Sequence, residues 1–282
     1  MLLVRSHGQL GNQIFHLLGA LSLLRAKEKL VLFGFGELIG LLPHLKSEHV
    51  VIPVPNRFSQ NLKFLERGLR KLARRGTIGR AHYGCDPQRL ARTDGKFSPT
   101  LFDAGNAQNY LAIRLDALQA FFERVDQDLG SWPQRQPQEE GELLCFVHIR
   151  RGDYLSHPSV EASIAIPDSW FLTQMTLIAS THPQVKFLLY SDDVDSLAEE
   201  IVSFPNTQIR NVDHIVAFQE MALADMGILS ASTFSWWSAM LANHRGAQGP
   251  FIGPRYWFGW RSGTWEPEGF FSKSLTYIPV SR

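Results

Sequence analysis

Residues 1–33, MLLVRSHGQLGNQIFHLLGALSLLRAKEKLVLF, change character in the order expected for strand, loop, helix and strand. Leu2–Val4 is apolar and predicts a short buried strand, while Arg5–Gly11 predicts a loop. Asn12–Lys27 carries apolar side chains on one helical face and predicts a helix, and Leu30–Phe33 predicts a second strand. This order opens a βαβ unit, whose loop stands at the carboxyl end of a parallel strand, where open α/β sheets bind ligands.

The same alternation returns in the second half of the chain. Strands are predicted at Leu143–Ile149, Lys186–Tyr190, Met226–Ser230 and Pro250–Gly253, and helices at Ser169–Ser180, Val194–Ser203, Val216–Ala224 and Trp236–Asn243. Residues 34–130 contain no repeat or long low-complexity run, and the polar, proline-containing stretch 131–141 predicts an exposed connection. We therefore predict an α/β protein with two Rossmann-like domains facing a cleft, residues 1–137 and 138–282, whose last helix or tail can cross back.

Composition excludes several classes of protein. The 28 Lys and Arg residues balance 27 Asp and Glu residues, so no overall field favours nucleic acid as a partner. The two cysteines, Cys85 and Cys145, form no close pair, which argues against a disulfide framework or a zinc site. The first residues lack the pattern of a secretion signal, and the apolar stretch Ile14–Leu24 is too short to span a bilayer. We therefore expect a cytoplasmic protein.

Arginines follow the predicted strand at 143–149. The segment His148-Ile149-Arg150-Arg151-Gly152-Asp153 would deliver two guanidinium groups to the end of the sheet. A guanidinium fork suits phosphate oxygens and could stabilise a departing diphosphate. A surface salt bridge between an arginine and Asp153 is the plainer interpretation, and both stay open.

Two further predicted strand–helix turns could bind an anion. Ser6–Gln13 joins the first strand to the first helix, although Asn12 could simply cap that helix. Ser230–Trp237 brings hydroxyl groups to another helix start, although Ser235 could be its cap while Trp236 and Trp237 fill the core.

Carboxylates gather after the strand at 186–190. Asp192 and Asp193 could bind ribose hydroxyls or orient an arginine. Asp193-Val194-Asp195 also has the DxD form of metal-dependent GT-A glycosyltransferases, which makes such an enzyme one alternative.

Taken together, GQLGNQ (8–13), HIRRGDY (148–154), YSDD (190–193) and STFSWW (232–237) occur in the order found in bacterial α-1,2-fucosyltransferases. The chain resembles this family, glycosyltransferase family 11, and shares its arginine motif with α-1,6- and protein O-fucosyltransferases. The resemblance implies a GT-B fold, GDP-fucose as donor, inversion at the anomeric carbon, and no metal or other cofactor. Three positions depart from the usual motifs, namely Gln9, Ala231 and Ser238.

The resemblance also implies roles for individual residues. Arg150 would hold the β-phosphate with support from Arg151, Asp153 would fix the arginine loop, and Asn12 would face the same pyrophosphate from the other domain. Arg150, Asn12 and Asp153 are the expected catalytic residues. The expected donor-binding residues are His148, at the guanine or ribose, together with Arg150, Arg151, Gly11, Asn12, Gln13, Asp192, Asp193, Ser232, Thr233, Phe234 and Ser235.

The acceptor is less defined by the sequence. The family implies a galactose-terminated oligosaccharide or a lipid-linked glycan, and His16, Asp153, Glu37 or none of them could act as general base. Basic residues within 63–75 recur on one side of a predicted helix, which could contact an anionic membrane or form a solvated face. A non-catalytic glycan-binding protein is the alternative from another class, suggested by seven tryptophans and the aromatic run 256–260.

Overall fold

The computed structural model describes residues 1–6, 8–46, 51–54, 63–83, 90–103, 108–133, 143–159, 162–247 and 249–281. The chain divides into two compact units. Unit 1 comprises Met1–Ser131 and Glu268–Phe271, and unit 2 comprises Trp132–Pro267 and Ser272–Arg282. The predicted boundary between residues 137 and 138 lies outside the described residues.

Unit 1 is built on a sheet in the order β3-β2-β1-β6-β4-β5. Neighbouring strands are parallel, except that β4 and β5 pair antiparallel at one edge. The strands are β1 (Leu2–Arg5), β2 (Leu30–Phe33), β3 (Val51–Val54), β4 (Ile78–Tyr83), β5 (Leu90–Thr93) and β6 (Phe97–Asp103). The helices are α1 (Leu10–Leu23), α2 (Gly36–Leu41), α4 (Lys63–Arg74) and α5 (Leu115–Asp128), with 3₁₀ turns η1 (Pro43–Lys46), η3 (Tyr110–Ala112) and η4 (Leu129–Ser131).

Alternation along the strands explains how unit 1 buries both faces of its sheet. Leu3, Val31 and Leu101 point to one face, where they pack with Leu69 and Ala73 of α4. Their neighbours Leu2, Val4, Leu30, Leu32 and Phe102 point to the opposite face and are buried as well. Near-continuous apolar strands are typical of parallel sheets covered on both sides.

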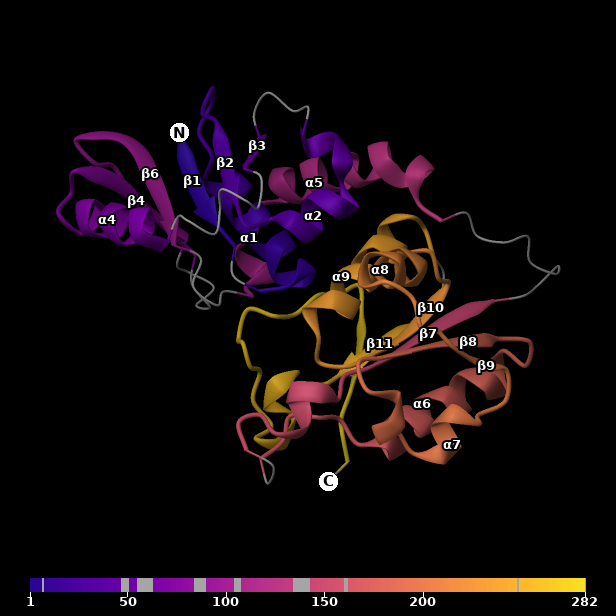
Figure 1. Ribbon diagram of the computed structural model, residues 1–282. Coiled ribbons are helices and arrows are strands. Elements are labelled where there is room, and N and C mark those ends of the chain that lie inside the picture. The colour runs from indigo at the N-terminus through magenta and orange to yellow at the C-terminus, as the bar shows by residue number, and fades with distance from the viewer. Residues whose placement is uncertain are drawn as a thin grey trace. The chain divides into compact units, whose positions relative to one another are not determined.

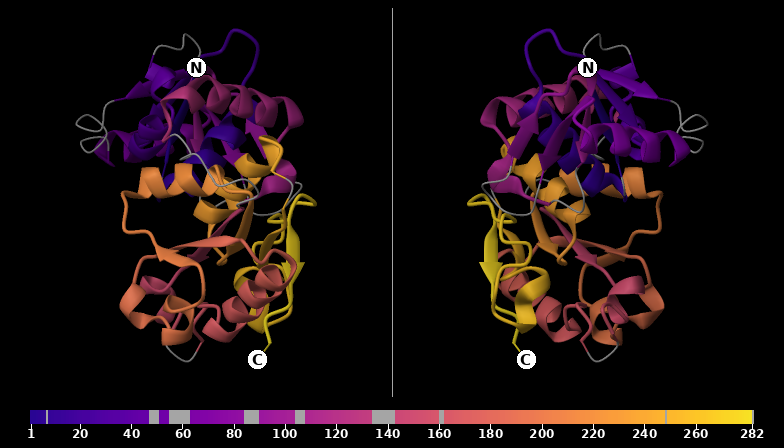
Figure 2. Two further views of the ribbon diagram at one scale, coloured as in Figure 1. Left: turned by 90° about the vertical axis from the view of Figure 1, so that its right-hand side faces the viewer. Right: turned by 90° about the vertical axis from the view of Figure 1, so that its left-hand side faces the viewer.

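Unit 2 has an entirely parallel sheet in the order β12-β11-β10-β7-β8-β9. Its strands are β7 (Leu144–Ile149), β8 (Lys186–Ser191), β9 (Thr207–Ile209), β10 (Met226–Leu229), β11 (Phe251–Pro254) and β12 (Thr276–Ile278). Its helices are α6 (Asp168–Thr181), α7 (Glu199–Val202), α8 (His214–Ala222) and α9 (Thr233–His244), with 3₁₀ turns η5 (Gly152–Leu155), η6 (Val194–Ser196) and η7 (Phe258–Arg261). The pair α6 and α7 covers one face of this sheet, and α8 and α9 cover the other (Figures 1 and 2).

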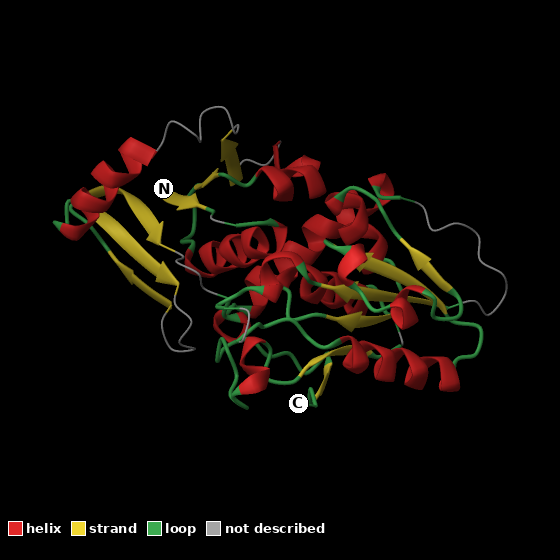
Figure 3. Ribbon diagram, turned by 60° about the horizontal axis from the view of Figure 1, so that its bottom comes forward, coloured by secondary structure: helices red, strands yellow, loops and turns green. Residues whose placement is uncertain are grey.

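The predicted α/β class with two Rossmann-like sheets is confirmed, and Figure 3 shows strands flanked by helices throughout. Several predicted elements need correction. The first helix begins at Leu10 rather than Asn12 and ends at Leu23 rather than Lys27. The helix predicted over Val194–Ser203 is instead two short segments, because Leu197 and Ala198 are extended between them.

Candidate functional site

Three loops of unit 2 meet at one edge of its sheet. The strands β10, β7 and β8 are adjacent and parallel, with Leu229 opposite His148 and His148 opposite Tyr190. The loops that follow these strands therefore leave the same edge, and they carry the arginines, the aspartates and the serines predicted as site residues.

Arg150 occupies the centre of this edge. Its guanidinium forms ion pairs with Asp153 (Nη2 to Oδ1, 2.7 Å) and Asp192 (Nη1 to Oδ2, 3.2 Å). The Arg150 side chain is 20% exposed and that of Asp153 is 72% exposed, so the first pair opens to solvent. Nε of Arg150 is buried and has no hydrogen-bond partner among the described residues. Arg150 thus has one N–H group, at Nε, that donates to no described residue. Its ion pair with Asp153 is exposed to solvent.

Arg151 is buried and engaged with other parts of unit 2. Its side chain is 4% exposed, and its guanidinium forms an ion pair with Asp168 and donates to the carbonyls of Arg150 (3.0 Å) and Ile166 (3.1 Å). The backbone N–H of Arg151 donates to Asp192 Oδ1 at 2.7 Å. These contacts make Arg151 a support for the loop that presents Arg150.

Gly152 permits the close approach of Asp192 to this loop. Its φ is +27°, and a Cβ at this position would lie 2.6 Å from Asp192 Oδ2. Any other residue would displace the carboxylate that accepts from both the Arg151 backbone and the Arg150 guanidinium.

The helix α9 begins at the same edge of the sheet. Its N-cap residue is Ser232, which makes no side-chain capping hydrogen bond. Ser235 is fully buried and donates back to the Ser232 carbonyl at 3.3 Å, so the idea that Ser235 caps the helix is wrong. Thr233 and Phe234 follow Ser232 in the first turn, whose backbone N–H groups favour an anion. Trp236 and Trp237 are fully buried in the core, as the sequence suggested for at least one of them.

His148 lies beneath this edge on the face covered by α9. Its ring is 5.6 Å from the ring of Phe234 and is 7% exposed, and Nδ1 has no hydrogen-bond partner among the described residues. Burial, with a smaller contribution from the Arg150 charge, lowers the pKa of His148 to about 3. The imidazole is therefore neutral at physiological pH and can offer a donor or an acceptor, but not a positive charge.

Sequence reasoning gave no role to three residues that position the arginines. Ser230 is buried and donates to the His148 carbonyl (2.8 Å) while accepting from the Arg150 backbone N–H (2.8 Å), which ties β10 to β7. Tyr154 lies under Arg150 (4.9 Å from Cζ to the ring centroid) and donates to the Ala231 carbonyl (2.9 Å). Burial raises the pKa of Tyr154 to about 12, so it stays a donor. Asp168 is the third, and its partner Arg151 lies 17 residues away in sequence.

The loop of unit 1 between β1 and α1 is held by its own side chains. Gln13 is buried, donates to the Gly8 carbonyl (3.2 Å) and accepts from the Leu38 N–H (3.0 Å). Asn12 Oδ1 accepts from Gln108 Nε2 at 3.1 Å, and Gly11 is buried within the first turn. Asn12 therefore lies inside the helix and is not its cap, which is Gln9.

The three candidate general bases differ in availability. His16 is 2% exposed and its Nδ1 lies 3.0 Å from Ser6 Oγ, so it belongs to the core of unit 1. Glu37 accepts from the Leu10 N–H at 2.6 Å and thereby caps α1 with a carboxylate from α2. The side chain of Asp153, in unit 2, is 72% exposed. It is therefore the most solvent-accessible of the three candidates.

The carboxylates after β8 have separate surroundings. Asp192 contacts both arginines, as described above. Asp193 is the N-cap residue of η6, and Asp195 lies within η6 and is exposed to solvent. Within the described part of the chain, no group of three or more His, Cys, Asp or Glu side chains is arranged to hold a metal ion.

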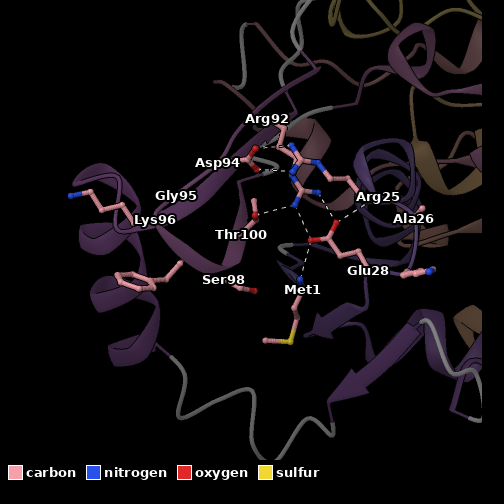
Figure 4. A pocket seen from close by; sticks show the side chains of 12 residues that line it. Met1, Arg25, Ala26, Glu28, Arg92, Asp94, Gly95, Lys96, Ser98 and Thr100 are labelled. Carbon is pink, nitrogen blue, oxygen red and sulfur yellow. Dashed lines mark hydrogen bonds and ion pairs between the residues drawn. The ribbon is translucent and has the colours of Figure 1, made fainter.

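A pocket in unit 1 lies at the opposite edge of its sheet from the β1–α1 loop. Figure 4 shows its centre, where Arg92 forms a two-bond ion pair with Glu28 (2.6 and 2.8 Å) and donates to Thr100 Oγ1 (3.1 Å). This hydrogen-bonded pairing with Arg92 lowers the pKa of Glu28 to about 2. The charges at the bottom of the pocket are thus matched internally.

These features define an α/β protein whose unit 2 presents an arginine and a helix start at one sheet edge, a set suited to a phosphate-containing ligand. Residues 124–248 match the family model described as glycosyl transferase family 11. This segment contains the motifs at 148–154, 190–193 and 232–237, and the family resemblance drawn from the motifs is confirmed over it. Residues 8–13 lie outside the matched segment.

Two proteins of Escherichia coli are similar to this chain in sequence. One, named alpha-1,2-colitosyltransferase, is 29% identical over 122 residues, 40% of this chain and 40% of its own. The other, named O-antigen biosynthesis glycosyltransferase WbnK, is 26% identical over 117 residues, 40% of this chain and 38% of its own. The similarity thus spans about two fifths of each relative. Among solved structures, POFUT1 in complex with GDP is 14% identical with a TM-score of 0.48, covering 89% of this chain and 98% of that one.

Proposed function

We propose that the protein is a glycosyltransferase that moves L-fucose from GDP-fucose to a hydroxyl group of a glycan. The observation that carries the proposal is Arg150 at the end of β7, at the same sheet edge as the start of α9, within the segment that matches glycosyl transferase family 11. Departure of a nucleoside diphosphate develops negative charge on its β-phosphate, which a guanidinium and helix N–H groups would stabilise.

Arg150 is the proposed catalytic residue of unit 2. In the structure its guanidinium forms ion pairs with Asp153 and Asp192. A diphosphate would replace the exposed Asp153 contact more easily than the Asp192 contact, because Asp192 is also fixed by the Arg151 N–H. Arg151 and Gly152 would act through this arrangement and not by touching the donor.

The finer features rest on the family resemblance. They are a GT-B arrangement, inversion at the anomeric carbon, transfer to the 2-hydroxyl of a terminal galactose, and catalysis without a metal. We include Asn12 as a second catalytic residue on the motif at 8–13, and His148, Asp193, Ser232 and Thr233 as further donor contacts. A galactose-terminated surface glycan or its lipid-linked precursor is the proposed acceptor, and the proposed location is the cytoplasm.

The test is the release of GDP from GDP-fucose by the purified protein, with and without galactosides, in EDTA or in manganese. GDP-mannose and UDP-galactose serve as competing donors. Release that needs a galactoside, persists in EDTA and is specific to GDP-fucose would support the proposal. Release only from another donor, or only with manganese, would contradict it and favour the metal-dependent alternative.

Transfer of colitose is a second candidate, favoured by the 29% identity to the colitosyltransferase. The anion site described above would serve either sugar, because it acts on the diphosphate. Nucleotide-activated colitose should therefore be included as a donor, and a higher kcat/KM for it than for GDP-fucose would decide for this candidate.

A further inference from the structure

We propose that unit 1 docks on anionic membranes through a patch formed by the exposed side of α4 and the turn between β5 and β6. The patch is defined as Arg67, Lys71, Leu72, Arg74, Arg75, Lys96 and Phe97. This inference does not depend on the proposed transferase activity.

The helix α4 has two unlike sides. Leu69 and Ala73 pack on the sheet of unit 1, where α4 lies against β4 and β6 (Figure 1). Arg67, Lys71 and Arg74 are exposed. Because its apolar side packs on the sheet, α4 presents its basic side outward, where an anionic lipid surface would attract the cations.

Backbone hydrogen bonds join the β5–β6 turn to the end of α4. The N–H of Lys96 donates to the Gly76 carbonyl at 3.1 Å, and the N–H of Phe97 donates to the Thr77 carbonyl at 3.0 Å. The Thr77 N–H in turn donates to the Leu72 carbonyl at 3.0 Å. Gly95 makes this contact possible, since a Cβ there would lie 2.1 Å from the Ile78 carbonyl carbon. Lys96 and Phe97 are thus fixed next to the basic end of α4.

Apolar side chains are exposed among these cations. Phe97 is 66% exposed and Leu72 is 39% exposed. A large apolar side chain surrounded by positive charge is unfavourable in water, but it suits a bilayer surface, where the ring enters the interface and the cations meet phosphate groups.

The charge of the patch is not neutralised by its acidic neighbours. Asp94 pairs with Arg25 (2.9 Å), and Asp103 pairs with Arg80 (3.3 Å) and more distantly with Arg70 (3.9 Å). Among the described residues, no ion pair engages Arg67, Lys71, Arg74, Arg75 or Lys96. Five cations on one surface complement an anionic leaflet, and each contributes attraction near such a surface.

The experiment is flotation of the full chain with vesicles of phosphatidylcholine alone or mixed with phosphatidylglycerol, at low and high salt. Binding to the mixed vesicles alone, reduced by salt, is expected. The triple variant Lys71→Gln, Arg74→Gln, Arg75→Gln should lower the partition coefficient about a hundredfold, at roughly fivefold for each cation. Phe97→Ser should weaken binding severalfold without changing its salt dependence.

A matched triple variant in unit 2, Lys186→Gln, Arg255→Gln, Lys273→Gln, removes the same charge from exposed positions and should bind as the wild type does. Thermal unfolding of every variant verifies folding. Absence of binding to the mixed vesicles, equal binding to both vesicles, or an equal loss in the two triple variants would overturn the proposal. Tighter binding to duplex DNA than to the mixed vesicles at the same salt would also overturn it.

Discussion

The β1–α1 loop of unit 1 and the loops that follow β7 and β10 in unit 2 all leave a buried parallel strand, yet their polar groups are engaged differently. In unit 1 a carboxylate, Glu37, takes the N–H of Leu10 at the start of α1. In unit 2 the N-cap residue of α9, Ser232, makes no side-chain capping hydrogen bond, and this helix start lies at the same sheet edge as Arg150. The first helix start repels an anion, and the second attracts one.

This contrast shows that loops with similar motifs in sequence can differ in how many of their polar groups are already engaged within the protein. Gln13 and Asn12 of unit 1 are engaged with Gly8, Leu38 and Gln108, so their amides mainly order the loop. We therefore expect donor affinity to depend on unit 2, and residues of unit 1 to influence turnover or acceptor use.

Arg150→Lys should have the largest effect. An ammonium group cannot replace the planar fork, so kcat should fall about a hundredfold or more while the fold is kept. GDP-release kinetics would measure the loss, with exposed Arg255→Lys as the matched control. Turnover within about threefold of the wild type would remove Arg150 from the mechanism.

Arg151→Met should mainly affect stability. It leaves Asp168 and two backbone carbonyls without their buried partner, and the free energy of unfolding should fall by about 3 kcal/mol. Denaturant unfolding followed by tryptophan fluorescence would test this, against exposed Lys186→Met. An unchanged unfolding curve with lost GDP binding would show instead that Arg151 contacts the donor.

Gly152→Ala should weaken GDP binding about tenfold, because its Cβ would displace Asp192 and with it the Arg150 fork. Gly246→Ala is a suitable control, since Gly246 also has a positive φ, +88°, but nothing within 4 Å of its added Cβ. Both variants should lose about 1 kcal/mol of stability from backbone strain. Equal GDP affinity in the two variants would contradict the role assigned to Gly152.

Stability should depend on pH through His148. Because its pKa is about 3 in the folded protein and near 6.5 when unfolded, the unfolded state binds the proton first as the pH falls. Stability should decrease between about pH 6.5 and pH 3, on the order of 1 kcal/mol per pH unit. His148→Gln should flatten this part of a stability–pH curve, and an unchanged slope in this variant would contradict the burial effect assigned to His148.

Asn12→Ala should have the smallest effect on donor affinity, changing the Kd for GDP by less than about threefold while lowering kcat. Calorimetric titration with GDP and the GDP-release assay would separate the two quantities. A loss of GDP affinity comparable with that of an Arg150→Gln variant would show that the two loops are equivalent after all.

The sequence predicted the elements whose signal is local. β2 was predicted with its observed bounds, and the strands before the site were found to within one or two residues. The start of α1 was missed because its cap comes from Glu37, 27 residues beyond Leu10. The break at Leu197 was missed for a similar reason, since the Ala198 N–H is held by Asp168, 30 residues away. The short edge strands β9 and β12 span only three residues each, too few for a periodic signal.

In the candidate site, too, features with a local sequence signal were predictable, and features that depend on residues distant in sequence were not. The position of Arg150 at the end of β7 was predictable, because both arginines directly follow an apolar run in the sequence. The ion pair with Asp153 that the sequence allowed is observed, and phosphate binding by Arg150 stays a prediction. The different surroundings of the two arginines were not predictable from the sequence. Arg151 is buried because it contacts Asp168 and the Ile166 carbonyl, whereas Arg150 is partly exposed. Ser230 and Tyr154 stood within or beside the motifs, but only their contacts reveal what they hold in place.

The excursion of Glu268–Phe271 into unit 1 restricts how such a protein can be recombined. Phe270 packs on Phe15 at 5.6 Å between ring centroids, and the Gly269 carbonyl accepts from the Leu111 N–H. Fusing residues 1–131 to the second half of a relative would therefore deprive unit 1 of Glu268–Phe271, which follow most of unit 2 along the chain. Exchange of the two halves by a single crossover is thus disfavoured, and an engineered chimera should carry both segments from one parent.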